Sequence, residues 1–278
     1  MRKSLLNLIL MGLFATQLNA EHQKIEIMIT NPRTVGNAFE KSMMARGDHK
    51  VFHEPWATPS LLNQPNTILS QELVEAKTYE GIKALIYRYA AEKPVFVKDI
   101  MAWTQNILTD EELMKDPQVV FSILLRNPAH SIESFFLKMM AIGSPEQAVQ
   151  ATKAFFRYDQ LVELSEKHYA LRMTWPIMIQ AEELCADPQS TMHYYCLQAD
   201  IPFIAEALSW QAGMPEEWKH REQYNFDTEA CASTGFYIPK RDSIEGNFTQ
   251  MPAEYVSALE EIYQAQKPFY EKLKTFTQ

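Results

Sequence analysis

The stretch Val119-Val-Phe-Ser-Ile-Leu-Leu-Arg126 decides the fold class of this 278-residue chain. It is apolar almost throughout, and it ends in a charged residue followed by Asn127-Pro128. A continuous apolar run of this kind is typical of a strand buried on both faces of a parallel sheet. Similar extended runs occur at 25–30, 51–52, 94–98 and 175–180. The sequence therefore predicts an α/β fold, with a central parallel sheet and helices on both faces.

Helical patterns separate these apolar runs. The stretches expected to be helical are 36–45, 70–92, 147–169, 191–197 and 252–275. Strands that alternate with helices are the pattern of βαβ units. Because no repeat, low-complexity tract or evident linker interrupts the order, residues 21–278 are expected to form one domain.

Composition excludes several classes of protein. The chain carries a formal charge of −9 and 46% hydrophobic residues, which suits a domain with a sizeable buried core. No basic stripe offsets the acidic balance, so a nucleic-acid partner is not expected. The three cysteines, Cys185, Cys196 and Cys231, form neither a CxxC pair nor a Cys/His set at zinc spacing. No metal site is therefore expected.

The N-terminus has the pattern of a secretory signal peptide. Arg2 and Lys3 precede an apolar run from Leu5 to Ala15, and the small Ala20 is followed by polar residues. The run is shorter than the roughly 20 apolar residues of a membrane span. We expect residues 1–20 to be removed, leaving an exported protein, periplasmic or secreted, with no stable membrane span. An N-terminal amphipathic helix is the alternative, and the protein would then be cytoplasmic.

The first apolar run ends in Thr30-Asn-Pro-Arg-Thr-Val-Gly-Asn37, where a helix is expected to begin. Ligands of open α/β sheets bind beyond the carboxyl ends of the strands. A helix N-terminus attracts anions through its free N–H groups, and Arg33 adds a planar cationic fork. The chain has no G-x-x-x-x-G-K-[ST] motif, so this is not a Walker A loop. The turn indicates an anion site, or else a plain strand-to-helix connection.

A second cationic position follows the deciding stretch. Arg126 leaves the strand at its carboxyl end, and Ser134 follows in the next expected helix. An Arg beside a buried strand often pairs with an acid, so a structural salt bridge is one interpretation. A second anion clamp is the other.

Taken together, the N-P-R turn and the later R-N-P-x-x-x-x-x-S resemble the motifs of the sulfotransferase family, whose donor is 3′-phosphoadenosine 5′-phosphosulfate (PAPS). The resemblance extends from about Lys24 to Leu273 and includes further stretches typical of one bacterial branch. These stretches are 51–55, 96–99, 184–188, 207–210, 233–236 and 268–273. The resemblance implies a P-loop NTPase-like sulfotransferase architecture. It also implies transfer of a sulfuryl group from PAPS to an acceptor hydroxyl or amine, with no metal.

The resemblance assigns the donor site to two groups of residues. The 5′-phosphosulfate would be held by Arg33, Thr34, Val35, Gly36, Asn37 and Ala38. The 3′-phosphate of PAPS, or of its product 3′-phosphoadenosine 5′-phosphate (PAP), would be held by Arg126 and Ser134. We expect the irregular residues 55–75 and 210–250 to shape the acceptor pocket.

The resemblance also implies catalytic residues. Lys98 ends a buried strand and matches a family Lys or Arg that helps bind the transferring group. Three residues compete for the role of base. Glu54 stands where tyrosylprotein sulfotransferases use a Glu and is the first choice, Asp99 is the second and His53 is the third.

The first loop departs from the family pattern P-[RK]-S-G-[ST]-[ST]. Val35 replaces the first Gly, and Gly36 and Asn37 replace two hydroxyl residues. Three interpretations stay open: Thr34 and the Asn37 amide partly compensate for the lost donors, the loop shifts by one residue so that Gly36 supplies the backbone freedom of the lost Gly, or the donor site has decayed. The last case would make the chain a non-catalytic secreted binding or effector protein on the same fold. A P-loop kinase for a small molecule shares the sheet but needs the Walker lysine that this chain lacks.

Overall fold

A five-stranded parallel sheet lies at the centre of the computed structural model, which describes residues 23–62, 69–219, 227–238, 246–248 and 250–276. The strand order is β2-β3-β1-β4-β5. The strands are β1 (Ile25–Thr30), β2 (Lys50–His53), β3 (Val95–Ile100), β4 (Val119–Leu125) and β5 (Ile177–Gln180). The predicted α/β class with a parallel sheet is confirmed. The expected signal peptide, residues 1–20, lies outside the described residues.

The register of the central strands brings their carboxyl ends level. Ile25 of β1 lies opposite both Val95 of β3 and Val119 of β4. The three strands therefore end side by side, and the residues that follow them share one edge of the sheet. This is the edge where ligands of parallel α/β sheets bind.

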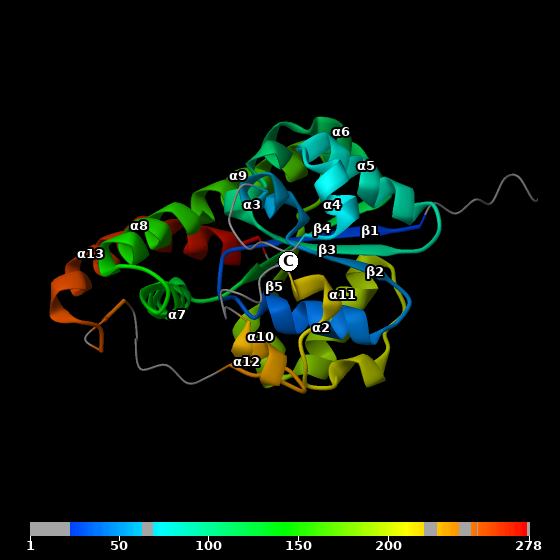
Figure 1. Ribbon diagram of the computed structural model, residues 1–278. Helices are drawn as coiled ribbons and strands as arrows, with labels where there is room; N and C mark the ends of the chain where they lie inside the picture. The colour runs from blue at the N-terminus through cyan, green and yellow to red at the C-terminus, as the bar shows by residue number, and fades with distance from the viewer. Residues whose placement is uncertain (1–22, 63–68, 220–226, 239–245, 249, 277–278) are drawn as a thin grey trace, which may run out of the picture.

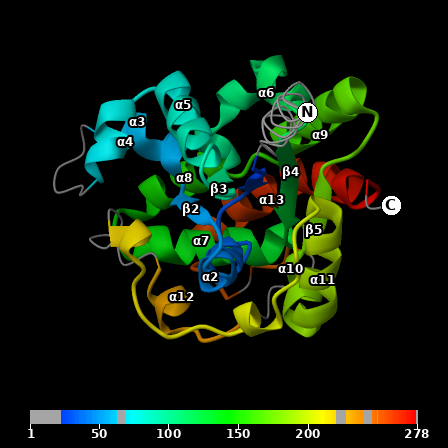
Figure 2. The ribbon, with the colours of Figure 1, turned by 90° about the vertical axis from the view of Figure 1, so that its right-hand side faces the viewer.

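Side-chain alternation along β1 divides the core into two layers. Ile25, Ile27 and Ile29 belong to the larger cluster, whereas Met28 belongs to a second cluster on the other face. Helices α5 (Tyr79–Ala90) and α9 (Tyr158–Arg172) cover the first face, and α2 (Gly36–Ala45) and α11 (Pro188–Ala199) cover the second (Figure 1). Figure 2 shows α3 (Thr58–Leu61), α4 (Gln71–Ala76) and α5 on one side of the sheet and α2 on the other.

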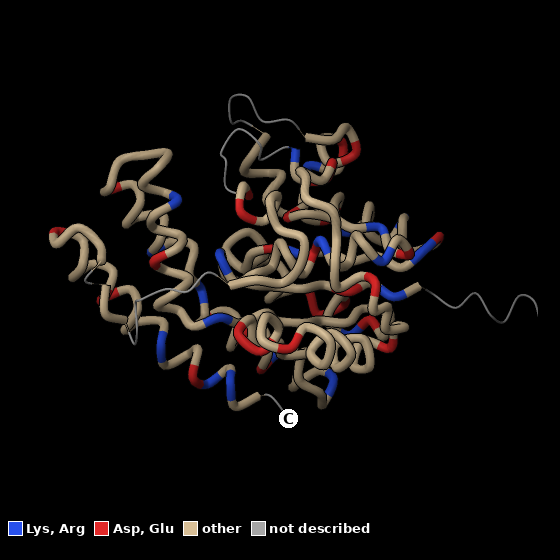
Figure 3. The backbone as a smooth tube through the Cα atoms, turned by 90° about the horizontal axis from the view of Figure 1, so that it is seen from below, with Lys and Arg blue, Asp and Glu red and all other residues tan. Residues whose placement is uncertain are grey.

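The remaining helices lie around this sheet. They are α6 (Glu111–Lys115), α7 (Pro128–Met140), α8 (Pro145–Phe155), α10 (Ala181–Ala186), α12 (Thr228–Ala232) and α13 (Ala253–Lys274). Short 3-10 turns are η1 (Pro55–Ala57), η2 (Met101–Trp103), η3 (Gln105–Thr109) and η4 (Ala205–Leu208). No helix among the described residues is both long enough and apolar enough to cross a membrane. Lys and Arg positions are interspersed with Asp and Glu positions along the described backbone (Figure 3).

Two stretches expected to be single helices are each two helices. The expected helix 70–92 breaks between α4 and α5, where Lys77 has a φ of 21° and the Thr78 hydroxyl accepts the Gly81 N–H as the cap of α5. The expected helix 147–169 breaks between α8 and α9. At that break the Arg157 N–H donates to Asn31 Oδ1 at 2.8 Å, so a contact with the β1–α2 turn replaces a helical hydrogen bond.

Candidate functional site

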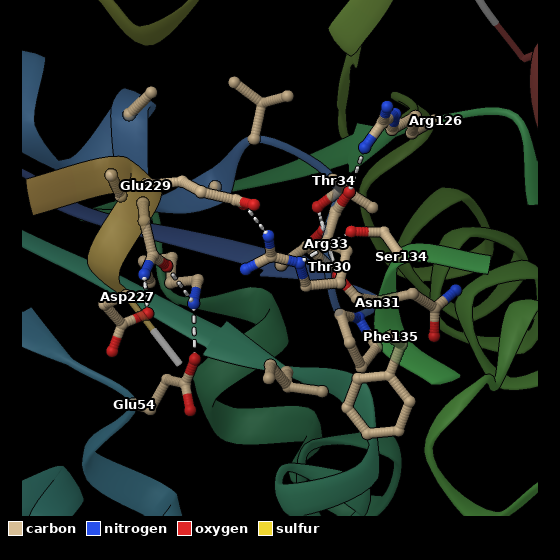
Figure 4. Close-up of a pocket in the computed structure, with 18 of the residues that line it drawn as sticks. Thr30, Asn31, Arg33, Thr34, Glu54, Arg126, Ser134, Phe135, Asp227 and Glu229 are labelled. Atoms are coloured by element: carbon tan, nitrogen blue, oxygen red, sulfur yellow. Dashed lines mark hydrogen bonds and ion pairs between the residues drawn. The ribbon is translucent and has the colours of Figure 1, made fainter. Parts of the chain in front are cut away.

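A cavity of about 900 Å³ opens at the carboxyl ends of β1, β3 and β4 (Figure 4). Its wall includes every residue that the family resemblance assigned to the donor. These are Arg33, Thr34, Val35, Gly36, Asn37, Ala38, Arg126 and Ser134. Glu54 and Lys98 line the same cavity. The structure therefore brings together residues that lie as much as 101 positions apart in the sequence.

The β1–α2 turn reaches α2 through two non-glycine residues with positive φ. Arg33 has a φ of 62°, and Val35, the residue before α2, has a φ of 70°. A residue with a Cβ costs about 1–2 kcal/mol in this left-handed region. Gly36 is the first residue of α2 and is not among the residues with positive φ. The prediction that Gly36 takes over the freedom of the lost Gly is therefore wrong, because Val35 itself adopts the left-handed conformation.

Gly36 has a different role, which is to admit a neighbouring side chain. A Cβ on Gly36 would lie 2.9 Å from Cε of Lys98 and 3.6 Å from Cγ2 of Thr30. Real Cβ atoms essentially never come as close to another heavy atom as the first of these distances. The glycine thus lets Lys98 lie directly against the N-terminus of α2.

Hydrogen bonds from β4 and from within the turn fix this strained backbone. Thr30 Oγ1 donates to the carbonyl of Leu124 at 2.9 Å, and the hydroxyls of Thr30 and Thr34 bond to each other. Arg126 Nη1 donates to the carbonyl of Arg33 at 2.8 Å. Val35 is the N-cap residue of α2, and its side chain accepts no hydrogen bond from the first N–H groups of the helix. The arrangement is that of a helix N-terminus facing a cavity, which favours an anion.

Arg33 links the turn to two other elements. Its Nε donates to Ser134 Oγ of α7 at 3.0 Å, and its Nη2 forms an ion pair with Glu229 of α12. The Lys138 ammonium lies 4.0 Å from the same Glu229 carboxylate. Arg33, which the resemblance assigns to the 5′-phosphosulfate, is therefore already engaged by a carboxylate of the chain itself.

Arg126 is buried, with 4% of its surface exposed. Its carbonyl accepts the hydroxyl of Tyr158 at 2.7 Å, which fixes the end of β4 beside the turn. The next residue, Asn127, caps α7 by accepting the Ala129 N–H at 2.9 Å. These bonds direct both Arg126 and the start of α7 toward the cavity.

Lys98 and Glu54 form a buried ion pair at the floor of the cavity, where their side chains are 4% and 2% exposed. Lys98 Nζ also donates to Asn37 Oδ1 at 3.0 Å, and burial lowers the pKa of Lys98 below its usual value. Glu54 has a φ of 44°, and its N–H donates to the Lys98 carbonyl at 2.7 Å. The strained backbone of Glu54 at the end of β2 is the kind of geometry that clusters at functional sites.

The other two candidate bases do not reach the cavity. Strand alternation puts Asp99 on the face opposite Lys98, where its carboxylate accepts the N–H of Trp56 at 2.9 Å and burial raises its pKa to about 7. His53 lies behind Glu54, with Nε2 4.0 Å from the Glu54 carboxylate and Nδ1 2.7 Å from Glu40. Neither side chain lines the cavity, so the structure does not bring Asp99 or His53 together with the donor residues.

Glu40 is a buried carboxyl group that was not predicted from the sequence. It accepts the indole N–H of Trp218 at 2.7 Å, and burial raises its pKa to about 8. The sequence contains a signal for this burial, because Glu40 comes directly after Phe39 and falls on the apolar face of the expected helix 36–45. The pair of Asp227 and Glu229, which faces the turn, had no local signal at all.

One part of the cavity wall is apolar. It consists of Ala57, Leu61, Ile100, Trp103, Phe135, Met139, Ile142 and Phe155. From the expected acceptor segment 55–75, Ala57 and Leu61 line this half, and residues 63–68 lie outside the described residues. From segment 210–250, the lining residues fall between Asp227 and Tyr237. These residues contact the donor turn rather than the apolar part of the wall. Glu229 forms an ion pair with Arg33, and Asn37 donates a hydrogen bond to Asp227.

Comparisons with known proteins bear on the fold. No protein-family model matches the chain. The chain is 28% identical over 224 residues to branched-chain-amino-acid aminotransferase-like protein 2 of Arabidopsis thaliana, and 27% identical over 222 residues to protein 1 of the same name. Each alignment covers 76% of this chain and 36% of the relative, so the chain spans about a third of the length of these relatives.

Among solved structures, mouse sulfotransferase SULT7A1 complexed with PAP superimposes with a TM-score of 0.52 at 9% sequence identity. The match covers 91% of this chain and 88% of the mouse chain. The fold is therefore sulfotransferase-like, a P-loop-like α/β architecture around a parallel sheet.

Proposed function

We propose that this chain is a PAPS-dependent sulfotransferase that moves a sulfuryl group to an acceptor hydroxyl or amine. The observation that carries the proposal is the convergence of Arg33, Arg126 and Ser134 on one cavity, at the N-terminus of α2. The sulfotransferase-like fold and the PAP bound to the mouse protein of similar fold support it.

The residues present fit a donor that carries two anionic groups. The first turn of α2 and Arg33 would hold the 5′-phosphosulfate, and Arg126 with Ser134 would hold the 3′-phosphate. Helix N-termini and Arg forks both bind such oxygens through charge-assisted hydrogen bonds. PAPS supplies the sulfuryl group and leaves as PAP.

Catalysis would then depend on Lys98 and Glu54. In-line group transfer is promoted by cations and N–H groups placed where negative charge develops. Lys98 carries the only ammonium group among the described residues that line the cavity, and it lies against the α2 N-terminus. Glu54, paired with Lys98 at the cavity floor, is placed to accept the proton of the acceptor.

Transfer of radioactive sulfur tests this proposal. The full chain is incubated with [35S]PAPS and, in separate reactions, a phenol, an aliphatic alcohol, a sugar and an amine. We expect a labelled organic product from at least one acceptor class. Glu54→Gln should lower the rate at least 100-fold, within the range known for loss of an acid or base, while PAP still binds.

The second candidate function is a non-catalytic binding protein on this fold. The ion pair between Arg33 and Glu229 favours it, because a carboxylate engages the arginine assigned to the 5′-phosphosulfate. The same assay separates the two, since a non-catalytic protein transfers no label to any acceptor class.

A further inference from the structure

The cavity is divided into a charged half and an uncharged half. Among the described lining residues, the charged side chains are Arg33, Glu54, Lys98, Arg126, Asp227 and Glu229. They lie on the donor turn, around it, or at the Lys98–Glu54 pair on the floor. The wall from Leu61 through Trp103 to Ile142 contributes no charged side chain.

Three aromatic rings form the fixed part of the uncharged half. The rings of Trp103 and Phe155 meet edge to face, with centroids 4.9 Å apart and planes at 86°. The rings of Phe135 and Phe155 lie 5.5 Å apart at 33°. Rings that hold one another in this way present a rigid apolar surface to a ligand. Such a wall suits a ligand that is itself apolar and ring-bearing.

The charge balance at the floor discriminates between acceptor hydroxyls and amines. Alkyl amines are cationic at neutral pH, and a cation that enters an apolar wall needs a counter-charge. Each carboxylate among the described lining residues already has a partner on the chain: Lys98 pairs with Glu54, Arg33 pairs with Glu229, and Asn37 donates to Asp227. A second cation beside Lys98 would be repelled, whereas an uncharged hydroxyl can donate to Glu54.

We infer that the acceptor of this site is an uncharged, ring-bearing alcohol or phenol, seated against Trp103, Phe135 and Phe155 with its hydroxyl directed at Glu54. This inference rests on the proposed function, because it names the substrate class of the same cavity. Multi-hydroxyl sugars are disfavoured by the same wall, since their buried hydroxyls would find no partners there.

A matched pair of ligands tests the inference. 2-Naphthylethanol and 2-naphthylethylamine have the same shape and differ in charge, and their binding to the full chain is measured by ligand-observed NMR with and without PAP. We expect the alcohol to bind at least tenfold more tightly than the amine. Glucose should show no binding at the same concentration.

Two substitutions complete the test. Ile142 lines the mouth of the apolar half and is 46% exposed, and Leu137 of α7 is 39% exposed but does not line the cavity. Ile142→Asp should weaken binding of the alcohol at least fivefold, and Leu137→Asp should leave it unchanged.

The outcomes separate this inference from the proposed function. Equal binding of alcohol and amine, or unchanged binding in Ile142→Asp, overturns the inference. If PAP binds but the alcohol does not, the inference alone fails. If the alcohol binds as expected but PAP does not, the apolar compartment stands and the sulfotransferase proposal fails.

Discussion

Glu229 forms an ion pair with Arg33 across 196 residues of sequence, and the pair joins α12 to the turn before α2. Two further contacts hold the same segments together. Asn37 donates to Asp227, and Lys41 Nζ donates to the carbonyl of Ala230 at 3.0 Å. An anionic donor that binds Arg33 must therefore compete with a carboxylate that is already there.

Removal of that carboxylate should strengthen donor binding. Glu229→Gln keeps the size of the side chain and removes the charge that repels a phosphate, so PAP is expected to bind 3- to 10-fold more tightly, about 0.7–1.4 kcal/mol. Calorimetric titration measures the change. Glu260→Gln on α13, distant in sequence and exposed, should leave the affinity unchanged. Weaker binding in Glu229→Gln would show that Glu229 supports the site rather than competing for it.

The positive φ of Val35 reverses an ordinary preference of the backbone. At most positions Gly is less stable than Ala, but at a φ of 70° Ala keeps the Cβ strain that Gly relieves. Val35→Gly should therefore be more stable than Val35→Ala by about 1 kcal/mol. Urea unfolding of the two variants decides this. If Ala is the more stable of the two, Val35 is not strained.

Gly36 offers a substitution that tests the position of Lys98. In Gly36→Ala the new Cβ meets Cε of Lys98, which is the far end of a flexible chain and can move aside. We expect the free energy of unfolding to fall by a few kcal/mol, because the loss of the buried Lys98–Glu54 pair outweighs the helix propensity of Ala. Sulfuryl transfer should fall at least tenfold, since Lys98 leaves its place beside Asn37 and Glu54. A variant with full transfer activity would contradict the role given to Lys98.

The buried Glu40 predicts a pH-dependent stability. Its pKa is about 8 in the folded chain, because burial disfavours the carboxylate, against 4.5 as its ordinary value. Between these pH values the unfolded chain loses the proton that the folded chain retains, so stability falls as pH rises. The groups that face Glu40 are His53, Trp218, Lys98, Asp227 and Glu217.

Glu40→Gln removes this titration while keeping a side chain that can accept the Trp218 N–H. We expect the variant to gain a few kcal/mol relative to the wild type between pH 5 and pH 8, with no further gain above that window. Urea unfolding at several pH values measures the difference. Glu254→Gln, on the exposed start of α13, should show no such slope.

The sequence predicts the parts of this molecule that depend on local pattern. Strands 25–30 and 119–125 have the predicted bounds, because each is an apolar run that ends in polar residues. The break between α8 and α9 was missed, because it depends on a bond from Arg157 to Asn31, 126 positions away. Local helix propensity does not depend on such a long-range contact.

The candidate site likewise has residues whose placement the sequence predicts and residues whose placement it does not. The donor residues follow strand ends, and parallel strands bring those ends together, so their convergence could be predicted. The separation of Lys98 from Asp99 could also have been predicted, since neighbours on a strand point to opposite faces. The pairing of Glu229 with Arg33 could not, because it depends on the path of the chain after α11.

Calorimetric titration of the full chain with PAP tests the central claim most directly. Arg126→Ala removes the residue predicted to hold the 3′-phosphate, and Arg172→Ala is the matched control, because Arg172 also donates to a main-chain carbonyl, that of Val119 at 2.7 Å. We predict micromolar binding in the wild type and in Arg172→Ala, and a loss of at least tenfold in Arg126→Ala. The absence of binding at millimolar PAP, or equal binding in Arg126→Ala, would contradict the assignment of this cavity to the donor.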